Sequence, residues 1–303
     1  MLGFEPLNRS ASLPTMRRMQ SDPLKIVGSG EPGFPTVLRL LPQPAACLWY
    51  AGRLPADGEP AVAVVGSRAA SRAASERAGA LAAALASRGH AVVSGGALGI
   101  DAAAHRGALE AGGATFAVLG CGIDVVYPDR HGPLYTAIAS DGGRHGGVLT
   151  ELPPGTPPKK GHFPVRNRIV AALGQAVLVV EARLASGALI TARLGREQGR
   201  KLLAVPGSAG TDTLIASGAA IAVENPGDLL AALAGDFRRP EPVVPQALAA
   251  LVAALRAGPA APAELAARMS VPLPQALGRL VEAELAGWAQ RLPGGRFEVP
   301  RAS

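Results

Sequence analysis

The sequence predicts an α/β fold in which a doubly wound parallel sheet is followed by a small C-terminal winged-helix-like domain. Three observations support this prediction. Six short apolar runs between residues 61 and 207 each end in a polar or glycine-bearing turn, alanine-rich helical segments separate them, and a helical pattern with a hairpin follows residue 245. Strands that alternate with helices pair in parallel. Such sheets bind ligands outside the carboxyl ends of their strands, where this chain carries small and polar residues.

The six apolar runs are the predicted strands. In chain order they are AVAVV at 61–65, HAVV at 90–93, TFAVL at 115–119, GGVLT at 146–150, AVLVV at 176–180 and LLAV at 202–205. They lead into Gly66-Ser67-Arg68, Ser94-Gly95-Gly96, Gly120-Cys121-Gly122, Glu151, Glu181 and Pro206-Gly207. These turns hold the candidate ligand contacts.

Composition indicates a globular protein with an excess of basic residues. The 303 residues are 48% hydrophobic, and 30 Lys and Arg against 23 Asp and Glu give a formal net charge of +7. This excess is typical of a protein that binds a polyanion, although an Arg- and Ala-rich composition produces it without such a partner. Cys47 and Cys121 are too few for a disulfide framework and lack metal-ligand spacing, so a reduced cytoplasmic setting is expected. The longest run without Asp, Glu, Lys or Arg, 242–255, is shorter than the ~20 residues that span a bilayer, so no membrane association is expected.

Proline divides the chain into four predicted parts. Residues 1–58 are rich in proline and are predicted to be irregular, with 1–20 as a lead segment. The sheet domain spans 59–236. A proline-rich, extended linker spans 237–245, and the winged-helix-like domain spans 246–303.

The C-terminal part has the pattern of a winged helix. Three helices are predicted at 246–257, 262–269 and 274–286, and a hairpin at 288–299 turns at Gly294-Gly295. The third helix of such a domain enters the major groove of duplex DNA. Here that helix carries Arg279 against Glu282 and Glu284, a net negative charge that opposes duplex binding. A protein-contact or regulatory role is therefore favoured.

The turn Gly66-Ser67-Arg68 precedes a helix predicted at 70–87. Gly66 lets the backbone approach a ligand, and the free N–H groups of a helix start attract anions. The Ser67 hydroxyl and the Arg68 guanidinium add donors for phosphate. The alternative is a plain strand–helix turn with Ser67 as the N-cap.

The second turn contains Ser94, Gly95 and Gly96 and leads into Asp101 and His105. Closely spaced glycines occur where the backbone turns left-handed or approaches a ligand. Asp101 is predicted to cap the next helix. His105 is either a hydrogen-bonded packing residue or a direct participant, and no Ser/His/Asp catalytic set can be assigned.

The segment 159–168 concentrates positive charge between the fourth strand and a helix predicted at 169–173. It contains Lys159, Lys160, Phe163, Arg166, Asn167 and Arg168. Its cations can neutralise successive phosphates, and the phenyl ring can stack on a base of any identity. The alternative is a solvated basic loop with Phe163 in the core.

Two glutamates, Glu151 and Glu181, follow strands and could act as an acid–base pair. They could equally cap helices or orient arginines, which a cationic site favours. Further along, Ser186-Gly187 precede a predicted helix, and 206–212 forms a small-residue turn.

Taken together and in order, these segments resemble the DNA-processing protein A family (DprA, also called Smf) of natural transformation. The resemblance covers about residues 34–223 and lies in Gly66-Ser67-Arg68, 94–101 with Ala104-His105, 117–124 with Tyr127-Pro128, 163–168, 180–182, 186–192, 204–207, and Leu214-Ile215 with Gly218-Ala219. One departure is Leu98, where many members of the family carry a basic residue.

The resemblance implies an extended Rossmann-like fold that binds single-stranded DNA, forms a homodimer and uses neither metal nor nucleotide cofactor. Members protect incoming strands and help to load the RecA recombinase. The residues then expected to contact the strand are Gly66, Ser67, Arg68, Ser94, Gly95, Gly96, Lys159, Lys160, Phe163, Arg166, Asn167 and Arg168.

An enzyme that acts on a nucleotide is the alternative. Residues 206–211 resemble the PGGxGT turn of Rossmann-like phosphoribohydrolases, but Ser208 replaces a glycine. The catalytic Glu and Arg expected near that turn are not evident, and the segment Phe163–Arg168 favours DNA. A non-catalytic binding protein is therefore expected.

Overall fold

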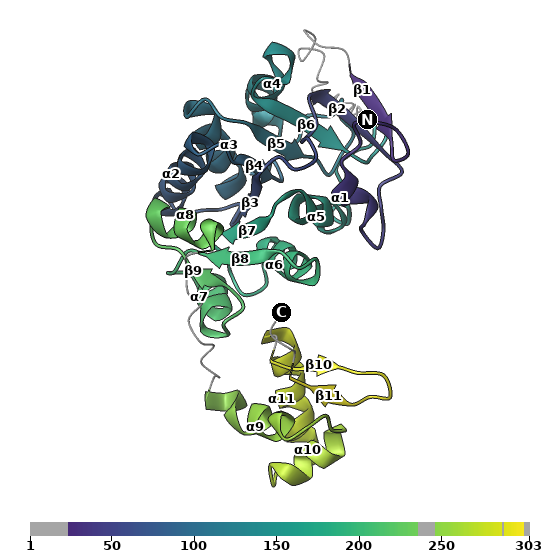
Figure 1. The fold of residues 1–303 in the computed structure, drawn as a ribbon, viewed down its shortest axis with the longest axis vertical. Coiled ribbons are helices and arrows are strands. Elements are labelled where there is room, and N and C mark those ends of the chain that lie inside the picture. Colours follow the sequence, from purple (N-terminus) through teal and green to yellow (C-terminus); the bar gives the residue numbers. More distant parts are fainter. Residues whose placement is uncertain (1–23, 236–245, 287, 300–303) are drawn as a thin grey trace, which may run out of the picture.

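The computed structural model describes residues 24–235, 246–286 and 288–299 (Figure 1). Its largest part is a nine-stranded sheet in the order β1-β2-β6-β5-β4-β3-β7-β8-β9. The six predicted runs form β3 (Ala61–Val65), β4 (Ala91–Ser94), β5 (Thr115–Val118), β6 (Gly146–Thr150), β7 (Ala176–Val179) and β8 (Lys201–Ala204). All neighbours within this group pair in parallel, and the short β9 (Ile221–Ala222) continues the pattern. The predicted doubly wound parallel sheet is confirmed.

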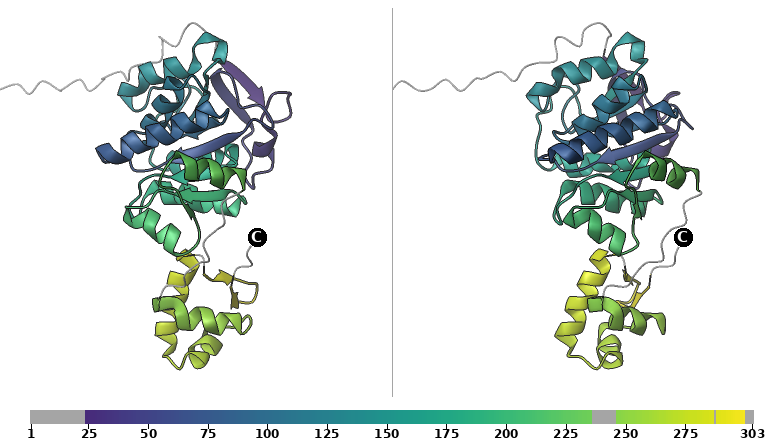
Figure 2. Two further views of the ribbon diagram at one scale, coloured as in Figure 1. Left: turned by 60° about the vertical axis from the view of Figure 1, so that its left-hand side comes forward. Right: turned by 90° about the vertical axis from the view of Figure 1, so that its left-hand side faces the viewer.

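Helices cover both faces of the sheet (Figures 1 and 2). They are α2 (Arg72–Ser87), α3 (Ile100–Glu110), α4 (Gly132–Ala139), α5 (His162–Leu173), α6 (Gly187–Glu197), α7 (Ala209–Ala216) and α8 (Pro226–Ala234). Because successive side chains of a strand point to opposite faces, Val62 and Val64 pack with α2, α3 and α8, whereas Ala63 and Val65 pack with α5 and α6. Burial on both faces explains why these strands are continuous apolar runs.

The expectation of an irregular N-terminal region needs correction where the structure describes it. Residues 25–52 contain β1 (Lys25–Gly28), α1 (Thr36–Arg39) and β2 (Cys47–Gly52). Strand β2 pairs antiparallel with β6, and β1 pairs antiparallel with β2. Four of the prolines in this region, at 32, 35, 42 and 44, lie between the two strands, where they interrupt no ladder. Residues 1–23 and the linker 237–245 lie outside the described residues, and the domain bounds stay predictions.

The C-terminal part has the predicted winged-helix pattern. It consists of η3 (Gln246–Leu248), α9 (Ala249–Arg256), α10 (Pro262–Arg268), α11 (Leu273–Ala286), β10 (Gln290–Arg291) and β11 (Phe297–Glu298), and the two strands pair antiparallel. A hydrophobic cluster of its own includes Leu251, Leu265, Leu280, Trp288 and Phe297. The three helices and the hairpin that the sequence predicts for this part of the chain are therefore confirmed.

Two glycines allow α2 and α3 to pack closely. A Cβ atom at Gly107 would lie 2.2 Å from the carbonyl oxygen of Gly79 on the facing helix. A Cβ atom at Gly79 would instead find its nearest neighbour, the Ala103 carbonyl oxygen, at an ordinary 3.7 Å. The contact thus needs glycine at Gly107 but not at Gly79.

Gly107→Ala should lower the free energy of unfolding by about 1–3 kcal/mol, because the added methyl group would push α3 away from α2. Gly79→Ala is the matched control, and it should be neutral or stabilise by up to about 1 kcal/mol through its higher helix propensity. Urea unfolding of both variants measures the difference. Equal effects of the two substitutions would contradict the proposed close packing.

Candidate functional site

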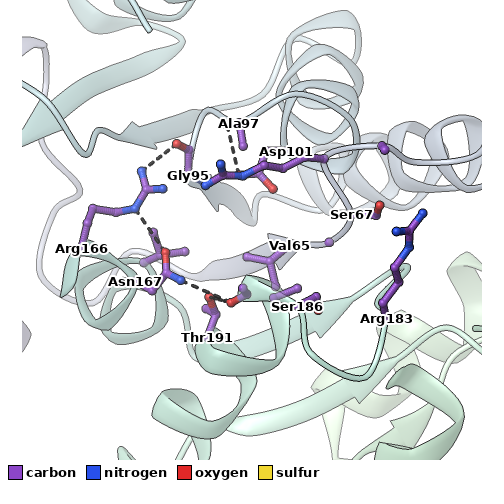
Figure 3. A pocket seen from close by; sticks show the side chains of 16 residues that line it. Val65, Ser67, Gly95, Ala97, Asp101, Arg166, Asn167, Arg183, Ser186 and Thr191 are labelled. Carbon is purple, nitrogen blue, oxygen red and sulfur yellow. Dashed lines mark hydrogen bonds between the residues drawn. The ribbon is translucent and has the colours of Figure 1, made fainter. Parts of the chain in front are cut away.

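The largest described cavity lies at the point where the winding of the sheet reverses. Strand β3 pairs with β4 on one side and with β7 on the other, and the carboxyl ends of these strands open toward the N-termini of α5 and α6. This cavity, called the main cavity from here on, has a volume of about 310 Å³ (Figure 3). Its lining includes Gly66, Ser67, Arg68, Gly95, Asp101, Arg166, Asn167, Arg183, Ser186, Gly187 and Thr191. Ligands of open α/β sheets bind at this position.

The first turn lines this cavity with Gly66, Ser67 and Arg68, and contacts within the fold fix its backbone. Gly66 has no room for a side chain, because a Cβ atom there would lie 2.5 Å from Cγ1 of Ile100. Ser67 is fixed by its backbone, since its N–H donates to the Glu181 carbonyl oxygen at 2.8 Å. The N-cap of α2 is Ser71, whose hydroxyl accepts from the Ala74 N–H, so the alternative of a Ser67 cap is wrong.

Asp101 organises the second turn instead of capping a helix. The N-cap of α3 is Gly99, and one carboxylate oxygen of Asp101 accepts from the N–H groups of Gly95 at 3.1 Å and Ala97 at 3.2 Å. Burial raises the pKa of this carboxyl group, whereas Arg166 and the two N–H donors act to lower it. The prediction of a cap was wrong because the side chain reaches back into the preceding loop.

Ser94 does not line any of the three cavities described here. Its hydroxyl is buried and donates to the Val64 carbonyl oxygen at 2.6 Å, which joins β4 to β3. Gly95 lines the main cavity, and Gly96 lines a smaller one of about 50 Å³ beside it. Gly95 and Gly96 thus lie at the ligand-binding edge of the sheet, whereas Ser94 holds β4 and β3 together next to them.

Arg166 is a buried cation that ties the site together. It is 4% exposed, and its Nη1 donates to the carbonyl oxygen of Gly95 at 2.7 Å and to that of Val118. Figure 3 shows Arg166 and Asn167 at one end of the main cavity and Arg183 at the other. Arg166 thus connects the ends of β4 and β5 to α5 while it also lines the cavity.

The basic segment is not a loop throughout. Helix α5 begins at His162, so Phe163–Arg168 form its first turns rather than preceding it. Arg168 makes a two-pronged ion pair with Glu151, at 2.5 and 2.6 Å, and lines none of the three cavities. Lys160 lines a third cavity of about 250 Å³, whereas Lys159 is exposed away from all three. The fold thus separates cations that the sequence groups together.

Phe163 is half-buried and lies between the two smaller cavities. Its ring packs over Gly120, where a Cβ atom would come within 2.7 Å of the ring. The Arg68 guanidinium lies 4.9 Å from the ring centroid, and the Tyr127 ring lies 5.5 Å away. Arg68 lines all three cavities, and Phe163 lines the two smaller ones. The alternative, in which Phe163 is buried in the core, therefore does not fit its half-buried position.

The acidic residues that could have formed an acid–base pair have structural partners. A carboxylate oxygen of Glu181 accepts from the hydroxyl of Ser71 at 2.8 Å, and Glu151 pairs with Arg168. In the turn that resembles PGGxGT, Asp212 accepts from the Gly207 N–H at 2.8 Å. None of the residues 206–212 lines the three cavities. These contacts agree with the orienting role that the sequence favoured.

Sequence reasoning did not include Arg183, Ser186, Thr191 or Tyr127 among the contact residues. Arg183 follows β7 closely, so the rule that ligands bind beyond strand ends could have identified it. Ser186 occupies the N-cap position of α6 without a capping bond, although its motif had been noted. Among the described residues, no cluster of three or more His, Cys, Asp or Glu has the arrangement of a metal site.

The comparisons with known proteins agree with this architecture. A family model described as DNA recombination-mediator protein A matches residues 25–234, and one for the DprA winged helix domain matches 236–295. The chain belongs to the DNA recombination-mediator protein A family. It is 36% identical over 290 residues to protein Smf of Escherichia coli, covering 86% of this chain and 75% of that protein. Over 273 residues it is 44% identical to a DNA processing protein DprA of Mycobacterium tuberculosis, covering 84% and 69%.

Two solved DprA structures have the same fold. The X-ray structure of the Streptococcus pneumoniae protein matches with a TM-score of 0.63 at 38% identity, covering 70% of this chain and 75% of that one. The second structure describes the single-stranded DNA binding mode of the Helicobacter pylori protein. It matches with a TM-score of 0.61 at 28% identity, covering 71% of this chain and 97% of that one. Within the described ranges, none of the helices combines the length and hydrophobicity that a bilayer span requires.

His105 is a packing residue beneath the second turn. It is fully buried, and its Nδ1 lies 2.7 Å from the Thr115 hydroxyl oxygen. Because that hydroxyl donates to the Val92 carbonyl oxygen, the His105 N–H is the donor in the first contact. Burial lowers the pKa of His105 to about 3, so the ring stays neutral in the folded protein.

A neutral buried histidine makes the folded protein acid-sensitive. The unfolded chain takes up a proton near pH 6.5 and the folded chain only near pH 3, so stability falls as the pH drops through this window. Between about pH 7.5 and about pH 5.5, His105 should account for a loss of about 1.4 kcal/mol. His105→Leu should reduce that loss, measured by urea unfolding at both pH values. An unchanged pH dependence in the variant would contradict this assignment.

Proposed function

We propose that this chain is a non-catalytic mediator that binds single-stranded DNA at the cavities around Arg68. It would protect incoming DNA and assist loading of the RecA recombinase in natural transformation. The observation that best supports this is that three cavities share the exposed Arg68, and that the two smaller ones also share the half-buried ring of Phe163. The family membership and the strand binding by the Helicobacter pylori relative agree with it.

Phosphate recognition would come from the first turn. Gly66, the Ser67 hydroxyl and the guanidinium of Arg68 would supply the contacts at the main cavity, and Arg183 lies at its opposite end from Arg166 (Figure 3). Arg166 is held by carbonyl groups within the fold, so direct charge neutralisation is assigned to the exposed Arg68, which lines all three cavities, and to the exposed Arg183 in the main cavity. Contacts to phosphate carry no sequence information, so binding should be independent of base identity.

A strand fits these cavities better than a mononucleotide substrate does. All three share Arg68, and two further exposed cations line them, Arg183 in the main cavity and Lys160 in the cavity of about 250 Å³. The carboxylates of Glu151 and Glu181 are used in an ion pair and a helix cap. These contacts favour a binding protein over the phosphoribohydrolase-like enzyme.

The partners and setting are also part of the proposal. A homodimer, the RecA contact and a cytoplasmic location rest on the family, in which recombination mediation is the shared description. Duplex reading by α11 is not proposed, because Glu282 and Glu284 outweigh Arg279 on that helix and Leu273 and Leu277 are 44% exposed.

The deciding experiment is fluorescence anisotropy with labelled oligo-dT over a salt series. Unlabelled duplex of equal length and nucleoside monophosphates serve as competitors. Tight, salt-sensitive binding that both competitors displace poorly is the expected result. Absence of strand binding, with competition or turnover of a monophosphate, would replace the proposal with the nucleotide enzyme.

Arg68→Ala should weaken binding to all single-stranded sequences by about tenfold or more, since a charge-assisted contact to phosphate is lost. The slope of log affinity against log salt should become shallower by about 0.7. Arg72→Ala is the matched control for net charge, because Arg72 is exposed on α2 and borders none of the three cavities. A loss confined to particular sequences would contradict phosphate recognition by Arg68.

Phe163→Ala should cost about 1–3 kcal/mol of strand-binding free energy if the ring stacks on a base. Phe163→Leu tests the ring itself, because leucine retains apolar bulk over Gly120 but has no aromatic face. Both affinities would be measured by anisotropy after thermal unfolding shows that the variants fold. Wild-type affinity in folded Phe163→Ala would assign Phe163 to packing alone.

A further inference from the structure

We propose that the cavity of about 250 Å³ is a second nucleotide subsite, in which a nucleobase stacks on Tyr127. This inference rests on the proposed single-strand binding and names the place of one more base. The cavity is lined by Arg68, Tyr127, Lys160, Phe163, Pro164, Asn167 and Gly187. Two aromatic rings, a proline and two cations thus surround it, and this combination suits a flat base with its flanking phosphates.

The position of this cavity suits the next nucleotide of a bound strand. It shares Arg68, Asn167 and Gly187 with the main cavity, so the two are contiguous. A strand that leaves the main cavity past Arg68 therefore meets the Tyr127 side chain. Lys160 lines the same cavity and is exposed, so it can neutralise the following phosphate.

Tyr127 is held in place by its backbone while its side chain stays accessible. Its carbonyl oxygen lies 2.8 Å from the hydroxyl of the buried Tyr135, which also lies 2.9 Å from the carbonyl oxygen of Gly96. The preceding Val126 is buried, and the following Pro128 accepts from the His131 N–H. The Tyr127 residue itself is 37% exposed. A pre-positioned, accessible ring loses little conformational freedom when a base stacks on it.

Tyr127 is also more available than Phe163 before a ligand binds. The guanidinium of Arg68 lies over the Phe163 ring, and Gly120 packs against that ring from the protein side. A base can stack on Phe163 only after Arg68 moves away from it. The Tyr127 ring lies next to the Phe163 ring, at a tilt of 35° between the two planes. A base of the bound strand could therefore stack on Tyr127 while Arg68 keeps its place over Phe163.

The test compares an ordinary oligo-dT with an oligonucleotide of equal length whose sugars carry no bases. Anisotropy would be measured with wild type, Tyr127→Ala, Tyr127→Leu and Tyr127→Phe. Against oligo-dT, the Ala and Leu variants should bind about tenfold or more weakly, and the Phe variant should stay within about twofold of wild type. Against the abasic strand, all four proteins should bind alike, because only the base contacts the ring.

Two results would overturn the subsite. One is wild-type affinity of the Ala and Leu variants for oligo-dT. The other is an equal loss on both oligonucleotides, which would assign Tyr127 to supporting the loop. The Leu and Phe variants keep the test valid if Tyr127→Ala does not fold. Failure of wild type to bind oligo-dT at all would instead contradict the proposed function, and the subsite with it.

A second readout is direct. Oligo-dT with a photoreactive 5-iodouracil crosslinks to an aromatic side chain that stacks on it, and mass spectrometry identifies the modified peptide. The expected product carries the modification on Tyr127, alone or together with one on Phe163. Crosslinks confined to Phe163 would overturn the assignment of a base to Tyr127.

Discussion

The buried guanidinium of Arg166 is the contact on which the site depends. An ionised group in the protein interior is tolerated only when it is paired and hydrogen-bonded. Arg166 donates to carbonyl oxygens at the ends of β4 and β5, while the buried carboxylate of Asp101 accepts from the N–H groups of Gly95 and Ala97. The glycine turn is thus held through its carbonyl and its amide groups by opposite charges. Loss of either side chain would leave the other charge buried with fewer partners.

This arrangement divides the cations of the site into two kinds. Arg166 and Arg168 are engaged within the fold, the first by carbonyl groups and the second by Glu151. Arg68, Lys160 and Arg183 are exposed and border the cavities. Only exposed cations release counterions when a polyanion binds, so the salt dependence of binding reports on them.

The sheet and its ligand edge could be predicted from the sequence because the central strands are buried on both faces. Continuous runs such as AVAVV carry that signal locally. Strands β1 and β2 gave no such signal, since they lie at one end of the sheet and several prolines fall between them. The roles of the cations were equally hidden. Lys160, Arg166 and Arg168 lie within nine residues of one another, and only the start of α5 at His162 decides which of them face inward.

Tyr127 illustrates why part of a site escapes sequence reasoning. In the sequence it lies 36 residues from Phe163, within a turn that follows β5, and no spacing rule connects the two. They meet because β5 ends and α5 begins on the same side of the sheet, and because Tyr135 fixes the Tyr127 carbonyl group. Arg68, from a third element, reaches the same place. A strand bound there would contact all three side chains at once, so their contributions to binding should depend on one another rather than add.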